Sequence, residues 1–323
     1  MFKLPLPQAD VKSNIEEFTD FIEWQCIRSG PVSLLSIIKP LMISQDEIKL
    51  RGIDDESDEL IAKLDDVGKE MERRKIACGG TYPFNISPNG YFINFTRESK
   101  NADVYLFLLL ATRLHMDKNK VQGGVDGTKI FEKISGPVAT SYFGERTTSI
   151  VFGTSTPGGF RAKVQELVKF IGEGAEFRDR DYGRSKPQDD KLDVVVLKDF
   201  SDKKSSKLIG FGQCKTGTTW DSKDLLELQP QVFCESWLMD QPIVTPIKMF
   251  FCAQYFPLDF HSKKKQAGLV FDRFRIMDCA PPLLPDLLAE VKQWNDAAFQ
   301  TANSSFQVLT IYKGSRKKVR PRK

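Results

Sequence analysis

Two apolar segments separated by a polar turn constrain the fold of this chain more than any other feature. The first runs from Lys191 to Leu197 and contains Asp193 followed by three valines. The second runs from Leu208 to Lys215 and ends in a Gln-Cys-Lys sequence. Apolar segments of this length on either side of a polar turn are typical of paired strands. The sequence therefore predicts a β-hairpin at 191–215.

The polar residues of this hairpin are expected to meet. Gln213 and Lys215 lie two residues apart on one strand, so their side chains project from the same face. Pairing of the strands brings Asp193 beside them. A carboxylate, an amide oxygen and an ammonium group at one point suit metal-assisted phosphodiester hydrolysis. The candidate ligands, including the backbone carbonyl of Cys214, are all oxygen atoms, so the expected ion is Mg²⁺, with Mn²⁺ as the alternative.

This Asp…Gln-x-Lys pattern resembles the motif of the PD-(D/E)xK nuclease superfamily over residues 128–280. The resemblance implies a restriction-endonuclease-like core, with a mixed central sheet flanked by helices. It also implies a Mg²⁺-dependent endonuclease that hydrolyses DNA in prokaryotic restriction or anti-phage defence. Asp193, Gln213 and Lys215 would be its catalytic residues. Gln213 stands where Asp or Glu is commoner, so Gln213→Glu is expected to retain or raise metal affinity.

Members of this superfamily also carry a glutamate on a helix before the aspartate strand. Glu166 is the preferred candidate for this catalytic and metal-binding position, because its predicted helix, 159–170, directly precedes that strand. Glu132, on a helix predicted at 129–143, is the rival. Both alternatives stay open at the level of sequence.

Basic residues near the motif are candidate contacts to DNA phosphates. They are Arg178, Arg180, Arg184 and Lys186 in a charge-dense segment, and Arg273 and Arg275 on a strand predicted at 268–276. The alternative for the first four is an exposed loop of mixed charge. The alternative for the last two is pairing with carboxylates of the site.

The amino-acid composition limits the classes of protein to which this chain can belong. The 323 residues suffice for two modest domains, and 41% hydrophobic residues are typical of a globular protein. The longest apolar run, 105–111, is too short to span a bilayer and predicts a buried helix. No signal peptide is recognisable, so a cytoplasmic protein that does not bind membranes is expected. Six scattered cysteines and two histidines argue against a zinc ribbon, a disulfide framework and a histidine-based nuclease.

The chain is expected to have an α/β fold with an α+β N-terminal part. Residues 1–125 predict a mostly helical domain for recognition, regulation or oligomerisation, and residues 126–312 predict the nuclease-like domain. Helices are predicted at 11–24, 55–75, 103–114, 221–237 and 285–301, and strands at 81–86, 91–96 and 245–254. Residues 313–323 carry seven positive charges and predict a disordered basic tail that attracts nucleic acid, or else a solubilising terminus.

Three functions remain open. The first is the DNA endonuclease, with DNA as its partner and a second copy of the chain or a defence-system protein as further partners. The second is a non-catalytic nucleic-acid-binding module on the same scaffold. The third is a nuclease acting on RNA or branched DNA. The presence of Asp193, Gln213 and Lys215 argues for an enzyme, because a decayed site usually loses its lysine.

Overall fold

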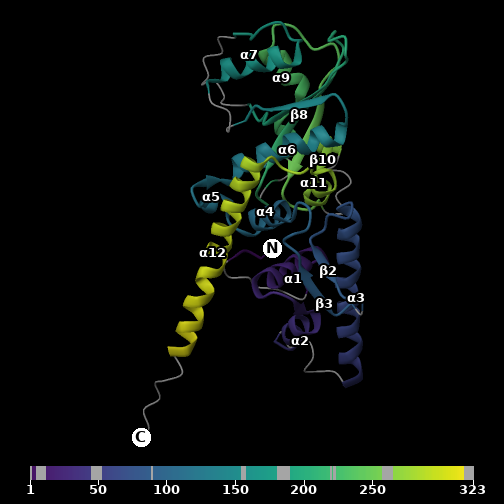
Figure 1. The fold of residues 1–323 in the computed structure, drawn as a ribbon, viewed down its shortest axis with the longest axis vertical. Helices are drawn as coiled ribbons and strands as arrows, with labels where there is room; N and C mark the ends of the chain where they lie inside the picture. Colours follow the sequence, from purple (N-terminus) through teal and green to yellow (C-terminus); the bar gives the residue numbers. More distant parts are fainter. Residues whose placement is uncertain are drawn as a thin grey trace. The chain divides into compact units, whose positions relative to one another are not determined.

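The computed structural model describes residues 2–4, 12–44, 53–88, 90–153, 158–179, 190–218, 220, 223–256 and 265–315. The chain divides into two units (Figure 1). The first unit comprises Met1–Gly123 and Lys292–Lys323, and the second comprises Gly124–Val291. The predicted α/β class is confirmed, because the second unit is built on a mixed sheet flanked by helices.

The sheet of the second unit has five strands in the order β10-β9-β8-β7-β6. Their bounds are β6 (Thr147–Val151), β7 (Val194–Lys198), β8 (Leu208–Lys215), β9 (Ile247–Cys252) and β10 (Leu269–Phe271). The pairs β6–β7 and β7–β8 are antiparallel, whereas β8–β9 and β9–β10 are parallel. The predicted hairpin is confirmed, with Val194 opposite Gly212 and Lys198 opposite Leu208.

Helices cover both faces of this sheet (Figure 1). On one face, α6 (Gly127–Phe143) packs against β6 and β7. On the other, α7 (Phe160–Ile171) and α9 (Pro230–Trp237) form an apolar core with β7 and β8. Residues 194–197 of β7 are all buried. A strand covered on both faces requires such a continuous apolar run.

Two elements of the second unit differ from their predictions. The helix expected at 221–237 is two shorter helices, α8 (Asp224–Glu227) and α9, because Pro230 occupies the first turn of the second. The strand expected at 268–276 ends at Phe271. There the side chain of Asp272 accepts a hydrogen bond from the backbone N–H of Arg275 (3.1 Å) and caps α11 (Arg273–Cys279). The strand position predicted for the two arginines is therefore wrong.

The first unit contains the helices and strands predicted near the N-terminus. They are α1 (Ile15–Ser29), β1 (Val32–Ser33), α2 (Leu34–Ser44), α3 (Ile53–Ala77), β2 (Phe84–Ile86), β3 (Phe92–Phe95), α4 (Ala102–Arg113), α5 (Met116–Asn119) and β4 (Val121–Gln122), with β5 (Val125–Asp126) just past the unit boundary. Every residue of α4 is buried, so the apolar run 105–111 is a core helix, as predicted. Within the described residues, no helix combines the length and apolarity needed to cross a bilayer.

The C-terminal helix α12 (Pro285–Ser315) extends 14 residues beyond its predicted end at 301. From Lys292 onward it belongs to the first unit rather than to the nuclease-like domain expected to reach residue 312. The indole N–H of Trp294 donates to the backbone carbonyl of Lys120 (2.9 Å). The side-chain NH₂ of Asn295 donates to the backbone carbonyl of Asp103 (2.8 Å). Residues 313–315 of the predicted tail continue this helix, and 316–323 lie outside the described residues.

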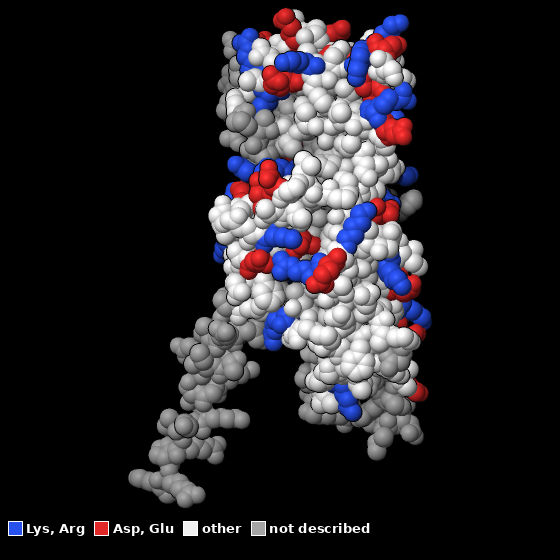
Figure 2. Space-filling model, viewed as in Figure 1, with Lys and Arg blue, Asp and Glu red and all other residues white. Residues whose placement is uncertain are grey.

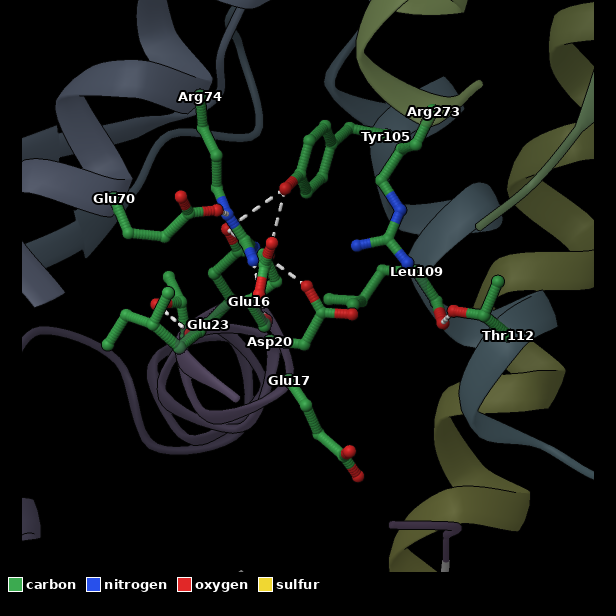
Figure 3. Close-up of polar contacts among 12 residues, drawn as sticks. Glu16, Glu17, Asp20, Glu23, Glu70, Arg74, Tyr105, Leu109, Thr112 and Arg273 are labelled. Atoms are coloured by element: carbon green, nitrogen blue, oxygen red, sulfur yellow. Dashed lines mark hydrogen bonds and ion pairs between the residues drawn. The ribbon is translucent and has the colours of Figure 1, made fainter. Parts of the chain in front are cut away.

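Buried charges connect the helices of the first unit (Figure 3). The fully buried guanidinium of Arg74 in α3 donates to Asp20 (2.7 Å) and Glu23 (2.7 Å) of α1 and to Glu70 (2.8 Å). Burial lowers the pKa of Arg74, but the charges of Glu23 and Asp20 outweigh this effect and hold it well above its ordinary value. The hydroxyl of Tyr105 donates to Glu23 (2.9 Å). Arg113 of α4, which is also fully buried, pairs with the same Asp20, so two buried cations join α1, α3 and α4.

Replacing Arg74 with alanine is expected to lower the stability of the first unit by about 3–5 kcal/mol, because the buried carboxylate of Glu23 loses the cation that pairs with it, and Asp20 and Glu70 each lose one of two. Arg73→Ala is the control. Arg73 also pairs with Glu70 (2.6 Å), but a third of its side chain is exposed, so water replaces the lost interaction and the cost is below about 1 kcal/mol. Hydrogen exchange of the α1 and α4 backbone amides in the full chain measures the loss of stability in each of the two variants. Equal protection in the two variants would contradict the central role of Arg74.

Candidate active site

Asp193 lies where three strands of the second unit meet. Its backbone N–H donates to the carbonyl of Gly212 on β8 (2.9 Å). Its carbonyl accepts from the N–H groups of Phe152 (2.7 Å) and Gly153 (3.0 Å), just after β6. Its carboxylate Oδ2 accepts from the backbone N–H of Cys214 (2.7 Å). Both the main chain and the carboxylate of Asp193 are therefore held in place.

A second carboxylate, that of Glu132, converges on Asp193. A Cβ atom built on Gly153 would lie 2.9 Å from Asp193 Oδ1 and 2.9 Å from Glu132 Oε1, so both oxygens face one point. Glu132 extends from α6 and is only 4% exposed. Glycine at 153 leaves the room that the two carboxylates occupy. A cation bound at this point would offset the repulsion between the two neighbouring carboxylates.

Glu166, the preferred candidate from sequence, is not part of this arrangement. α7 turns Phe160, Val164 and Leu167 toward the core, and Glu166 is exposed, about 100° around the helix from Leu167. The structure thus brings the rival Glu132 next to Asp193, and the preference for Glu166 is corrected. Periodicity predicted both helices, but it did not show which acid faces the sheet.

Gln213 and Lys215 project from the same strand as predicted, and both contact α8. Gln213 is 1% exposed, and its Nε2 donates to Glu227 Oε2 (2.7 Å). Its Oε1 is buried and has no hydrogen-bond partner among the residues that the structure describes. Gln213 lies beside Asp193, because Asp193 bonds to both chain neighbours of Gln213. The unpartnered oxygen is what a cation ligand at this position would offer.

Lys215 is an ion-pair partner of α8. Its Nζ lies 2.7 Å from Asp224 Oδ1 and 2.9 Å from Glu227 Oε2. Burial lowers the pKa of Lys215, but the hydrogen bonds and charges of the two acids outweigh burial and raise it. The ammonium group therefore stays protonated at neutral pH. Neither acid was predicted from sequence, although their i, i+3 spacing just after the strand that carries Lys215 places both on one face of a helix.

Cys214 contacts Asp193 through its backbone N–H and the helix α6 through its thiol. Burial, followed by the charge of Asp193, raises the pKa of its thiol well above the ordinary value, and Glu132 adds to the increase. The thiol contacts the hydroxyl of Ser135 on α6 (3.4 Å). Cys214 thus carries a neutral thiol beside both carboxylates, and its carbonyl as a metal ligand stays a prediction.

These residues match the donor set of a hard divalent cation. The carboxylates of Glu132 and Asp193 and the Oε1 of Gln213 are oxygen donors of the kind that Mg²⁺ prefers. Within the described part of the chain, no three or more His, Cys, Asp and Glu side chains are arranged to hold a metal ion. The site therefore offers two acids and one amide rather than an all-acid cluster.

The basic residues predicted to bind DNA are only partly described. Arg178 donates to the carbonyls of Glu235 (3.1 Å) and Met239 (3.0 Å), and Arg275 donates to that of Val270 (3.0 Å). Arg180, Arg184 and Lys186 lie outside the described residues.

Arg273 is fully buried and donates to the carbonyl of Ala253 (3.2 Å), a position from which it cannot reach a phosphate. On the face shown in Figure 2, the described basic and acidic side chains are interspersed within each unit. The described surface in this view therefore gives no continuous basic path for DNA.

Comparison with known proteins found no relative of this chain. No protein-family model, curated protein or solved structure matches this chain significantly. The geometry of these residues is therefore the basis for a function.

Gly153→Ala tests whether the two carboxylates share one point. The added methyl would approach Glu132 Cδ to 2.8 Å, so the flexible glutamate must move away. We expect a loss of Mg²⁺ binding in calorimetry with a stability cost of about 1–3 kcal/mol. Gly68→Ala, on α3 with nothing within 4 Å of the new methyl, is the control and should bind Mg²⁺ like the wild type. Unchanged Mg²⁺ binding by Gly153→Ala would contradict this geometry.

Proposed function

We propose that this chain is a Mg²⁺-dependent endonuclease of the PD-(D/E)xK superfamily that hydrolyses DNA phosphodiester bonds. The observation that carries the proposal is the convergence of the Asp193 and Glu132 carboxylates at Gly153. The buried, unpartnered oxygen of Gln213 supports it. Mn²⁺, which accepts the same donors, is the alternative ion.

The order of elements in the second unit supports the proposal. The helix α6 precedes three antiparallel strands, β6, β7 and β8, and α9 then leads to β9, which runs parallel to β8. A helix, a strand hairpin, a helix and a parallel strand form the core that the resemblance implies. Glu132 on α6 thus occupies the helix position where that superfamily carries its glutamate.

Each residue has a role that its chemistry allows. Glu132, Asp193 and Gln213 Oε1 would hold the cation. A bound divalent cation polarises a phosphate and lowers the pKa of a water molecule. Lys215, kept protonated by Asp224 and Glu227, would donate to the attacking water or to a phosphate oxygen as negative charge develops in the transition state.

The setting of this activity is also part of the proposal. A restriction or anti-phage nuclease acts in the cytoplasm, where it meets foreign DNA. The first unit would recognise DNA, a second copy of the chain or a partner protein. The basic residues at 313–323 would add non-specific attraction to phosphates.

One observation favours a second candidate, a module that binds nucleic acid without cutting it. Lys215 is already neutralised by Asp224 and Glu227, so less of its charge is available to a phosphate. RNA and branched DNA are the substrate alternatives for a cutting enzyme. A substrate panel separates all of these functions.

The test is incubation of the purified full chain with supercoiled plasmid, linear duplex, branched DNA, single-stranded DNA and RNA, in Mg²⁺, Mn²⁺ or EDTA. Wild type should cut DNA only with the cation. Asp193→Asn and Lys215→Ala should each lower the rate by at least about a hundredfold, because one removes a ligand and the other a transition-state charge.

Glu166→Gln is the control for these variants and should cut like the wild type, because Glu166 is exposed outside the site. Cutting by Lys215→Ala at the wild-type rate would contradict the assignment. Binding of nucleic acid without cleavage, by every variant and in both metals, would favour the binding module.

A further inference from the structure

Glu227 holds both polar residues of the motif at once. Its Oε2 accepts from Gln213 Nε2 (2.7 Å) and from Lys215 Nζ (2.9 Å), and its Oε1 lies 3.4 Å from Lys191 Nζ. The three described groups that it contacts here are all donors, namely two ammonium groups and one amide NH₂ group, so this carboxylate acts as an acceptor.

This pairing fixes the orientation of the Gln213 amide. A carboxylate paired with two lysine ammonium groups accepts hydrogen bonds, so the NH₂ group of Gln213 faces Glu227. The amide oxygen then points away from Glu227, and this is the buried oxygen without a described partner. Glu227 thus determines that the buried, unpartnered atom of the Gln213 amide is its oxygen and not its nitrogen.

We propose that Glu227 is a positioning residue that makes glutamine, and not an acid, the residue required at position 213. The inference rests on the proposed function of the site as a cation-binding centre. A carboxylate at 213 would lie at the 2.7 Å separation where Gln213 Nε2 now donates to Glu227. Two carboxylates this close repel each other, and neither offers the other a hydrogen-bond donor.

The pairing changes the outcome expected from the sequence motif. There, Gln213→Glu alone was expected to retain or raise metal affinity, because it restores the commoner acid. With Glu227 opposite, the new carboxylate loses its donor and faces a like charge. Only the exchanged pair, Gln213→Glu with Glu227→Gln, restores one donor and one acceptor across the contact. In that pair the amide NH₂ at 227 takes the place of Oε2 and donates to the acid at 213. The amide oxygen stays beside Lys191, and Lys215 keeps its pairing with Asp224.

The experiment compares the full-length wild type with Gln213→Glu, Glu227→Gln and the exchanged pair. The first readout is Mn²⁺ binding, followed by electron paramagnetic resonance. The second is the free energy of unfolding in urea without metal, analysed as a double-mutant cycle. The exposed pair Gln231–Glu235 on α9, with Gln231 Nε2 2.8 Å from Glu235 Oε1, is exchanged in the same way as the matched control.

We expect Gln213→Glu to weaken Mn²⁺ binding by at least about tenfold, as loss of an outer partner does at metal sites. The exchanged pair should bind Mn²⁺ at least as tightly as the wild type, and its stability should exceed the sum of the two single effects. The control pair should leave Mn²⁺ affinity unchanged. Tighter binding by Gln213→Glu alone, or additive stability effects, would overturn the proposal.

The two readouts separate this inference from the proposed function. Strong coupling in urea with no Mn²⁺ binding by any variant would refute the cation site, and with it the role of Glu227 toward a metal, while confirming the contact itself. Mn²⁺ binding by the wild type without coupling between positions 213 and 227 would refute the role of Glu227 alone.

Discussion

The geometry of the candidate site depends on the hydrogen bonds of one residue, Asp193. Its backbone N–H and carbonyl join β8 to the segment that follows β6, and its carboxylate accepts from the backbone of Cys214. A single residue thus fixes the relation between three neighbouring chain segments. Because this short hydrogen bond (2.7 Å) holds one carboxylate oxygen of the half-buried Asp193, the second oxygen has little freedom left.

The positions of the other site residues follow from that anchor. Strand register puts Gln213 beside Asp193, and the two-residue period carries Lys215 to the same face. The missing side chain of Gly153 leaves space for Glu132 from α6. A hairpin, one glycine and one helix are therefore enough to assemble the oxygen donors, while the first unit has its own buried charges around Arg74.

The features that sequence predicted correctly are those encoded locally. The valines after Asp193 and the apolar residues before Gln213 specified the hairpin, because their pattern needs burial on both faces. The features that were missed depend on tertiary packing. Periodicity could not show that Glu132 rather than Glu166 meets Asp193, or that α8 supplies Glu227 to the motif. Arg273 was misplaced because the Asp272 cap starts a helix within an apolar run that resembles a strand.

The central claim is that Glu132 and Asp193 together hold a divalent cation, and calorimetric titration with Mg²⁺ tests it most directly. The wild type and Glu166→Gln should bind Mg²⁺ alike. Glu132→Gln should bind at least about tenfold more weakly, because the change removes one of only two acidic donors. Equal binding by Glu132→Gln and the wild type, or stronger loss in Glu166→Gln, would contradict this account of the site.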